Sequence, residues 1–225
     1  AYWLGFLFGD GWIDKNRDQL SCESIDIEHM ERLHNTVGGS STINNRDRSL
    51  ERGKENCRPT AVFGIYDRKI VSDLKKLGMI QGGEKSKIGC VRINLIPKKL
   101  HRHFWRGLTD ADGYVKAYSN KSYRNGKGIS RIEIKNSKAH IDLLYHEWKK
   151  LGFNGIPKSY EYKTKTKGMQ TQWYIVTAGD QICKRIAEWL YSDCSVKLNR
   201  KYTEAIEMLG KKAIHRKYDH LGKEE

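Results

Sequence analysis

The chain has 225 residues, which is enough for one large domain or two of about 110 residues. Apolar residues make up 38% and aromatic residues 10%, and this content excludes a disordered chain although 31% of the residues are charged. The formal net charge of +15 predicts an anionic partner, with nucleic acid as the leading class.

The spacing of the cysteines and the lengths of the apolar stretches indicate which kind of protein and which compartment to expect. The five cysteines are scattered and form no CxxC pair, which argues against a disulfide framework or a zinc cluster: Cys22, Cys57, Cys90, Cys183 and Cys194. We therefore expect a reducing compartment, either cytoplasm or an organelle. The longest apolar stretches, such as Trp3 to Phe8, fall short of the roughly 20 residues that span a bilayer, so we expect a soluble protein without a membrane partner. Because the chain opens inside a predicted helix, we also expect natural residues before Ala1.

The first half begins with the apolar helical stretch WLGFLFGDGW, from Trp3 to Trp12. The segments predicted after it are a strand at 19–25, a helix at 27–37, extended segments at 41–48 and 60–66, and a helix at 68–77. The second half begins with a similar stretch, FWRGLTDADGYV, in which Gly107 follows Gly5 by 102 residues. The segments predicted after it are strands at 114–119 and 129–135, a helix at 139–151, strands at 158–166 and 170–177, and a helix at 180–191.

Both halves thus read as α-β-β-α-β-β-α, and their long spacing is typical of a duplicated domain. We predict an α+β fold of two pseudo-symmetric repeats, residues 1–100 and 101–225, with the repeated helices paired between them. Period-2 alternation supports the strands: Ile132 and Ile134 oppose Arg131, Glu133 and Lys135. The polar, glycine-containing segments 46–58 and 118–128 are predicted loops.

Each repeated stretch ends in an acidic residue. Its small residues are four apart and share one helix face, Gly5 with Gly9 and Gly107 with Ala111, which allows two helices to approach closely. If these helices pack about a twofold axis, Asp10 and Asp112 emerge near each other, and the paired carboxylates favour a hard divalent cation such as Mg²⁺. We expect the glycines at 11 and 113 to let the chain leave each helix in a left-handed turn. The alternative is that both acids merely end two buried helices, which the matched second copy disfavours.

The stretches LGFLFGDG and RGLTDADG resemble the LAGLIDADG motif, and two copies about a hundred residues apart resemble a single-chain, two-repeat LAGLIDADG homing endonuclease. The segment WLYSDCSVKLNRKY, from Trp189 to Tyr202, is similar to the end of the second repeat in that family. The resemblance implies four-stranded antiparallel sheets that form a saddle over DNA. It also implies a metal site formed by Asp10 and Asp112 together with Gly9 and Ala111. The earlier motif acid is Asp110 in the second copy and Phe8 in the first, and because that position is not a metal ligand, Phe8 does not argue against activity.

The resemblance also implies a lysine near each active site. Matching the segments that follow the last helix of each repeat selects Lys85 and Lys201 as catalytic residues, with Lys87 and Lys197 as close alternatives. Because the chain holds 42 lysines and arginines, a merely solvated basic face is the alternative. The eight histidines form no HxxxH or HEXXH pattern, so zinc catalysis has little support.

The polar faces of the strands are predicted to meet bases and phosphates in the DNA major groove, against the alternative of a solvent-exposed half-buried sheet. The residues predicted to bind DNA are Arg46, Arg48, Arg131, Lys135, Lys163, Lys165, Gln170 and Gln172. Trp12 and Tyr114, each directly after an Asp-Gly pair, are expected to pack in a core or interface rather than to stack on bases.

Together these patterns predict a site-specific double-strand DNA endonuclease that hydrolyses phosphodiester bonds with Mg²⁺, one cut per strand. We expect Mn²⁺ to substitute, Ca²⁺ to bind without supporting cleavage, and a monomer to act on a long, specific duplex. One alternative is a non-cleaving nucleic-acid binder with the same fold, either an intron RNA maturase or a DNA-binding regulator. Another is a basic RNA-binding protein whose duplicated helices only pack, which predicts no metal dependence.

Overall fold

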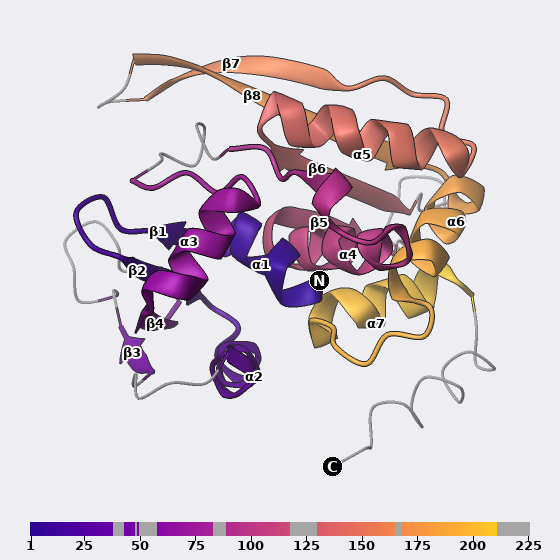
Figure 1. Ribbon diagram of the computed structural model, residues 1–225. Coiled ribbons are helices and arrows are strands. Elements are labelled where there is room, and N and C mark those ends of the chain that lie inside the picture. The colour runs from indigo at the N-terminus through magenta and orange to yellow at the C-terminus, as the bar shows by residue number, and fades with distance from the viewer. Residues whose placement is uncertain are drawn as a thin grey trace. The chain divides into compact units, whose positions relative to one another are not determined.

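The computed structural model describes residues 1–37, 43–47, 49, 58–82, 89–117, 130–164 and 168–210 (Figure 1). The predicted α+β class is confirmed, because the described residues form two antiparallel four-stranded sheets accompanied by α-helices. Contacts divide the chain into two compact units, Leu7–Leu95 and Ala1–Phe6 with Ile96–Glu225. The first helix, α1 (Tyr2–Asp10), therefore contributes its opening turns to the unit that holds the second repeat. The predicted boundary at residue 100 stays a prediction.

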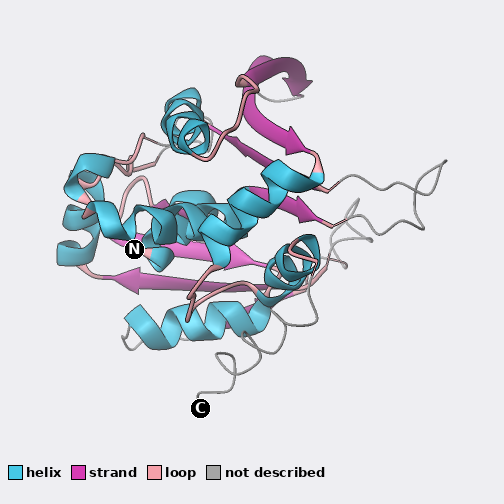
Figure 2. Cartoon of the chain, turned by 90° about the vertical axis from the view of Figure 1, so that its right-hand side faces the viewer, coloured by secondary structure: helices cyan, strands magenta, loops and turns pink. Residues whose placement is uncertain are grey.

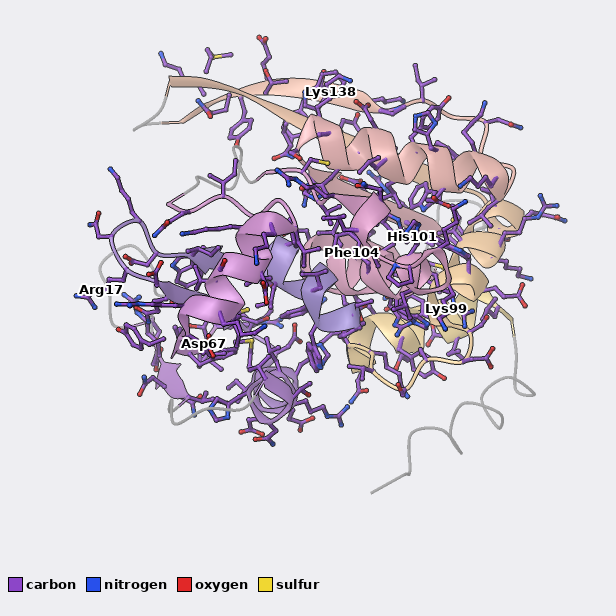
Figure 3. The ribbon with its side chains drawn as sticks, viewed as in Figure 1. Arg17, Asp67, Lys99, His101, Phe104 and Lys138 are labelled. Carbon is purple, nitrogen blue, oxygen red and sulfur yellow. The ribbon has the colours of Figure 1, made fainter. Side chains whose placement is uncertain are left out.

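The unit Leu7–Leu95 is built on a sheet with strand order β1-β2-β4-β3. Its elements are β1 (Gly11–Ile13), β2 (Gln19–Ser24), α2 (Ile27–Val37), β3 (Asn44–Arg46), β4 (Thr60–Tyr66) and α3 (Arg68–Lys76). Helix α3 begins where Asp67, labelled in Figure 3, accepts hydrogen bonds from the backbone N–H groups of Lys69 and Ile70. The predicted segment 41–48 is described in part, and most of the predicted loop 46–58 lies outside the described residues.

The other unit contains the sheet β5-β6-β8-β7. Its elements are α4 (His101–Asp112), β5 (Gly113–Lys116), β6 (Arg131–Asn136), α5 (Lys138–Lys150), β7 (Lys158–Thr164), β8 (Gly168–Ala178), α6 (Asp180–Tyr191) and α7 (Asn199–Met208). Short 3₁₀ turns at Ile93–Leu95 and Lys98–Leu100 precede α4. Figure 1 shows α5 beside β6 and β8, which it contacts, and Figure 2 distinguishes the helices (cyan) from the strands (magenta). The predicted loop 118–128 lies outside the described residues.

Alternation fixes which face of this sheet is buried. Ile132 and Ile134 of β6, and Ile175 and Thr177 of β8, point to the face that α5 and α6 cover, and all four are buried. The opposite face carries Arg131, Glu133 and Lys135 of β6, as the period-2 pattern predicts. This outer face is the one on which nucleic-acid contacts were predicted.

Helix α7 was not predicted from the sequence. Its buried residues include Lys201, Ala205 and Met208, which recur at the four- and three-residue spacing of a helix. A lysine in the first of these positions breaks the apolar pattern, which explains why periodicity alone did not reveal the helix.

The opening turns of α1 pack against α4 at two glycines. A Cβ on Gly5 would lie 1.9 Å from the carbonyl oxygen of Phe104, a residue of α4 labelled in Figure 3, and a Cβ on Gly107 would lie 1.9 Å from the carbonyl oxygen of Tyr2. Each glycine therefore receives the backbone of the other helix where a side chain would stand. Of the other small residues of the motifs, Gly9 is buried and Ala111 is half-buried.

The expectation that the glycines at 11 and 113 adopt left-handed conformations is wrong. Gly113 is extended, with φ −86° and ψ 158°, and Gly11 is not among the glycines with positive φ. The reason for glycine is steric instead. A Cβ on Gly11 would lie 2.6 Å from the carbonyl oxygen of Leu7, and one on Gly113 would lie 2.5 Å from that of Thr109.

Substitution Gly107→Ala is expected to lower the free energy of unfolding by about 2 kcal/mol or more, because the new methyl group forces two helix backbones apart. The matched control is Gly64→Ala, whose Cβ would meet the flexible amide end of Gln19 rather than backbone. Urea denaturation followed by circular dichroism measures both. Equal stability of the two variants would contradict the close helix approach.

A buried histidine gives the fold a pH dependence. His140 on α5 is fully buried, its Nδ1 lies 3.0 Å from the Ser137 hydroxyl, and burial lowers its pKa to about 4. Because the folded state disfavours the charged imidazolium, stability is complete above the unfolded pKa of about 6.5 and falls as pH drops toward 4.

We expect this one group to remove up to about 3 kcal/mol of folding free energy between pH 6.5 and 4. The loss should be absent in His140→Asn and retained in His146→Asn, which changes an exposed histidine of the same helix. The measurement is the denaturation midpoint at a series of pH values. An identical acid response in wild type and His140→Asn would refute the assignment.

Candidate active site

Asp112 ends α4 at the edge of the second sheet. The residue after it, Gly113, pairs with Ile134, so the start of β5 lies beside the end of β6. Asn136, the last residue of β6, donates a hydrogen bond from its Nδ2 to Oδ2 of Asp112 over 3.1 Å. Asn136 is buried whereas Asp112 is half-buried, so a fixed amide orients a carboxylate that still reaches the surface.

This carboxylate opens into a pocket of about 440 Å³ on the outer face of the sheet. The pocket is lined by Asp112, Gly113, Tyr114, Arg131, Glu133 and Lys135. Glu133 stands between the two cations: Lys135 Nζ lies 3.2 Å from its Oε1, and Arg131 Nη2 donates to its Oε2. The hydrogen bond that Lys135 donates to Glu133 raises the pKa of Lys135, so this ammonium group stays charged. A site that holds carboxylates and cations together suits a phosphate ester with a metal ion.

The second acid of the motif, Asp110, lies in a different environment. It is buried and accepts hydrogen bonds from the hydroxyls of Tyr2 (2.7 Å) and Tyr191 (2.6 Å) and from the backbone N–H of Leu198 (2.8 Å). Burial raises the pKa of this carboxyl, while the Lys201 ammonium and these donors oppose the rise. Asp110 therefore ties α1, α4 and α6 together from inside.

Lys201 also lies inside the protein. It is 3% exposed, and its Nζ donates to the carbonyl oxygens of Thr109 (2.8 Å), Asp110 (2.6 Å) and Ala111 (3.3 Å) at the end of α4. A positive charge at this end of a helix is favourable because the helix dipole is negative there. The alternative lysine, Lys197, is also buried, with its Nζ 4.7 Å from the centre of the Tyr202 ring. Lys85 and Lys87 lie outside the described residues.

Asp10 belongs to the other unit. It is the last residue of α1, is half-buried, and precedes β1 directly, as Asp112 precedes β5. In the part of the chain that the structure describes, no group of three or more His, Cys, Asp or Glu side chains could hold a metal ion. The oxygen donors at the ends of α1 and α4 are nonetheless of the type that Mg²⁺ takes, because it commonly binds one or two carboxylates together with waters and substrate phosphates.

The residues predicted to contact DNA fall on both faces of the sheets. Arg131, Lys135, Gln170 and Gln172 share the outer face of the second sheet, since Lys135 pairs with Tyr174 and Gln172 with Tyr160. Lys163 is exposed, but it pairs with Met169 and so lies on the opposite face. Arg46 is exposed on edge strand β3 of the first sheet, and Arg48 and Lys165 are outside the described residues.

The aromatic residues after the two motifs are not core residues. Trp12 is 38% exposed and Tyr114 is 46% exposed, so the part of the expectation that places them in the core is wrong, and packing in an interface stays a prediction. Strand alternation gives the reason: the neighbours Ile13 and Val115 take the inward positions, which turns Trp12 and Tyr114 outward. Both are therefore on the polar faces of their sheets, where Tyr114 lines the pocket at Asp112.

No helix among residues 1–37, 58–82, 89–117, 130–164 and 168–210 combines the length and the hydropathy required to span a bilayer. No protein-family model matches the sequence, and a search of curated proteins finds no match.

Solved structures resemble the chain over nearly its whole length. The LAGLIDADG homing endonuclease I-GzeII in complex with its DNA target matches 99% of this chain and 93% of its own, with a TM-score of 0.55 and 13% identity. Meganuclease I-SmaMI bound to uncleaveable DNA matches the same shares, with a TM-score of 0.54 and 13% identity. The homing endonuclease I-WcaI bound to its DNA recognition sequence matches 91% of this chain and 84% of its own, with a TM-score of 0.53 and 13% identity. The chain therefore has the single-chain, two-domain fold of the LAGLIDADG homing endonucleases.

Proposed function

We propose that this protein is a site-specific, metal-dependent endonuclease of double-stranded DNA. The observation that carries the proposal is the pocket at Asp112, where a carboxylate at a helix end meets Arg131 and Lys135 on the outer face of a sheet. The similar structures of I-GzeII, I-SmaMI and I-WcaI contain DNA, which supports the same partner for this chain. The net charge of +15 agrees with a polyanionic partner.

Each residue at the Asp112 pocket has a separate role in the proposed reaction. The Asp112 carboxylate would hold the divalent ion, and Asn136 orients that carboxylate through the 3.1 Å hydrogen bond. Arg131 and Lys135 supply positive charge for the phosphodiester. A bound Mg²⁺ supplies Lewis-acid polarisation of the phosphodiester and offsets the negative charge that develops during hydrolysis.

In the same proposal, Asp10 acts in the cleavage of the second DNA strand. It ends α1 as Asp112 ends α4, and a strand with an outward aromatic residue follows each of them. One acid per repeat then gives one cut per strand from a single chain. The expected protein is a monomer that recognises a long duplex site with both sheets.

We expect Asp112→Asn to lower the cleavage rate about 1000-fold, because an amide is a poor ligand for Mg²⁺ and the metal contributes several kcal/mol. Duplexes that the protein selects from a randomised library, cloned into a supercoiled plasmid, provide the substrate. With Mg²⁺ the wild type should yield linear plasmid, and Asp112→Asn should yield nicked plasmid or none while still binding. Asp142→Asn, an exposed acid of α5 paired with Lys138, is the control and should cleave normally.

Unchanged cleavage by Asp112→Asn would sink the metal assignment. Tight, selective binding by the wild type without cleavage in Mg²⁺ or Mn²⁺ would favour the non-cleaving nucleic-acid binder instead. Cleavage by the wild type that persists in a chelator would exclude the metal-dependent mechanism.

Asn136→Ala should weaken the metal dependence rather than abolish activity. Residues that orient a metal ligand typically contribute 10- to about 100-fold in metal affinity or activity. The Mg²⁺ concentration at half-maximal cleavage should therefore rise by about this factor, because Asp112 loses its orienting amide. Asn154→Ala, at an exposed loop position, should leave the titration unchanged. Identical Mg²⁺ titrations for wild type and Asn136→Ala would show that the hydrogen bond does not position Asp112.

A further inference from the structure

Two lysines lie close to the end of α4, and their surroundings differ sharply. Lys201 is 3% exposed, and its ammonium group donates to three backbone carbonyl oxygens. Because an ammonium group has three protons, these contacts use its full donor capacity. Lys201 can turn toward a bound phosphate only if the end of α4 loses this support.

Lys135, in contrast to Lys201, lies at the surface. Its side chain is 47% exposed and lines the same pocket as Asp112. It projects from β6 onto the outer face, where its Nζ lies 5.5 Å from the centre of the Tyr160 ring. Lys135 is thus a long, charged side chain at the surface on which a nucleic acid would lie.

Glu133 limits where this ammonium group can go. Its side chain is only 10% exposed, and its carboxylate accepts from Arg131 on one side and Lys135 on the other. The three residues alternate along one strand and share one face, so the acid sits between two cations of the same row. A long, flexible lysine is held over the pocket by this arrangement instead of swinging through solvent.

We propose that Lys135 is the lysine that contacts the DNA phosphate at Asp112, that Glu133 is its positioning residue, and that Lys201 is an internal support of α4. The inference rests on the proposed function, because the phosphate in question is that of the cleaved duplex. It replaces the expectation that Lys201 acts at the reacting phosphate. A lysine shielded inside the protein stabilises the helix that carries Asp112, and a lysine in the pocket meets the substrate.

Reductive methylation of lysines followed by peptide mass spectrometry tests the assignment without any need for cleavage. With a selected duplex bound, methylation of Lys135 should fall about tenfold when about 90% of the protein is in complex, because only unbound protein then reacts. Lys149, at the far end of α5, serves as the control and should react equally with and without DNA. Lys201 should stay unmodified in both samples.

Equal methylation of Lys135 in free and bound protein would overturn the proposal. So would methylation of Lys201 in the folded protein at a rate close to that of Lys135. Cleavage is scored separately, in samples that receive Mg²⁺. Protection of Lys135 without cleavage would reject the endonuclease and leave only a contact of Lys135 with the bound duplex. Cleavage without protection would reject the phosphate contact and leave the proposed function in place.

The variant Glu133→Gln tests the positioning residue. Removing the carboxylate lowers the pKa of Lys135, so a larger neutral fraction should react and its methylation in free protein should accelerate several-fold at fixed pH. The pH at which Lys135 reaches half its maximal rate should fall, while the profile of Lys149 stays in place. A merely structural role for Glu133 predicts identical Lys135 profiles in wild type and variant, and that result would contradict the proposal.

Discussion

The close approach of α1 and α4 at Gly5 and Gly107 is the constraint on which the rest of the unit formed by Ala1–Phe6 and Ile96–Glu225 depends. A Cβ added to either glycine would lie only 1.9 Å from a carbonyl oxygen of the other helix. No side chain fits there, so the two helix backbones are in direct contact. That contact brings Tyr2 to the Asp110 carboxylate, which also accepts hydrogen bonds from Tyr191 and Leu198. The end of α4 is thereby fixed from inside, and the direction in which Asp112 leaves the helix is fixed with it.

The two acids of the second motif acquire different roles from position alone. Residues two apart in a helix point to different sides, so Asp110 faces the interior while Asp112 faces the sheet edge. The interior acid meets hydroxyl and backbone donors, whereas the edge acid meets the Asn136 amide and a polar pocket. This difference explains why Phe8 can stand at the position of Asp110 in the first motif: the site calls for an interior residue, and Phe8 is fully buried.

Much of the fold could be predicted because the spacing of apolar residues along the sequence shows which side chains are buried. Helix α2, strand β4 and helix α6 begin and end where the pattern places them, and Ile132 and Ile134 are buried as expected. What could not be predicted depends on tertiary surroundings. A sequence does not show that the Lys201 ammonium group meets three carbonyl groups, and it does not reveal that Gly113 is needed to clear Thr109 rather than to adopt a positive φ. The core position considered for Tyr114 is wrong because the alternation of β5, which aromatic character alone does not reveal, turns this ring outward.

Under the proposed function, Glu133, which lies between Arg131 and Lys135 on β6, has a consequence for the recognition of DNA. Arg131 and Lys135 without Glu133 would attract any phosphate backbone, since such attraction is independent of sequence. With Glu133 between them, each cation must exchange part of an existing ion pair for a contact with DNA, and a duplex that supplies only charge gains less from the exchange. A duplex that also presents a matching base edge recovers the difference, because a carboxylate accepts from the cytosine amino group and an arginine pairs with guanine. In the proposed endonuclease, strand β6 would therefore lower general affinity in favour of discrimination, which a nuclease acting within a large excess of other DNA requires.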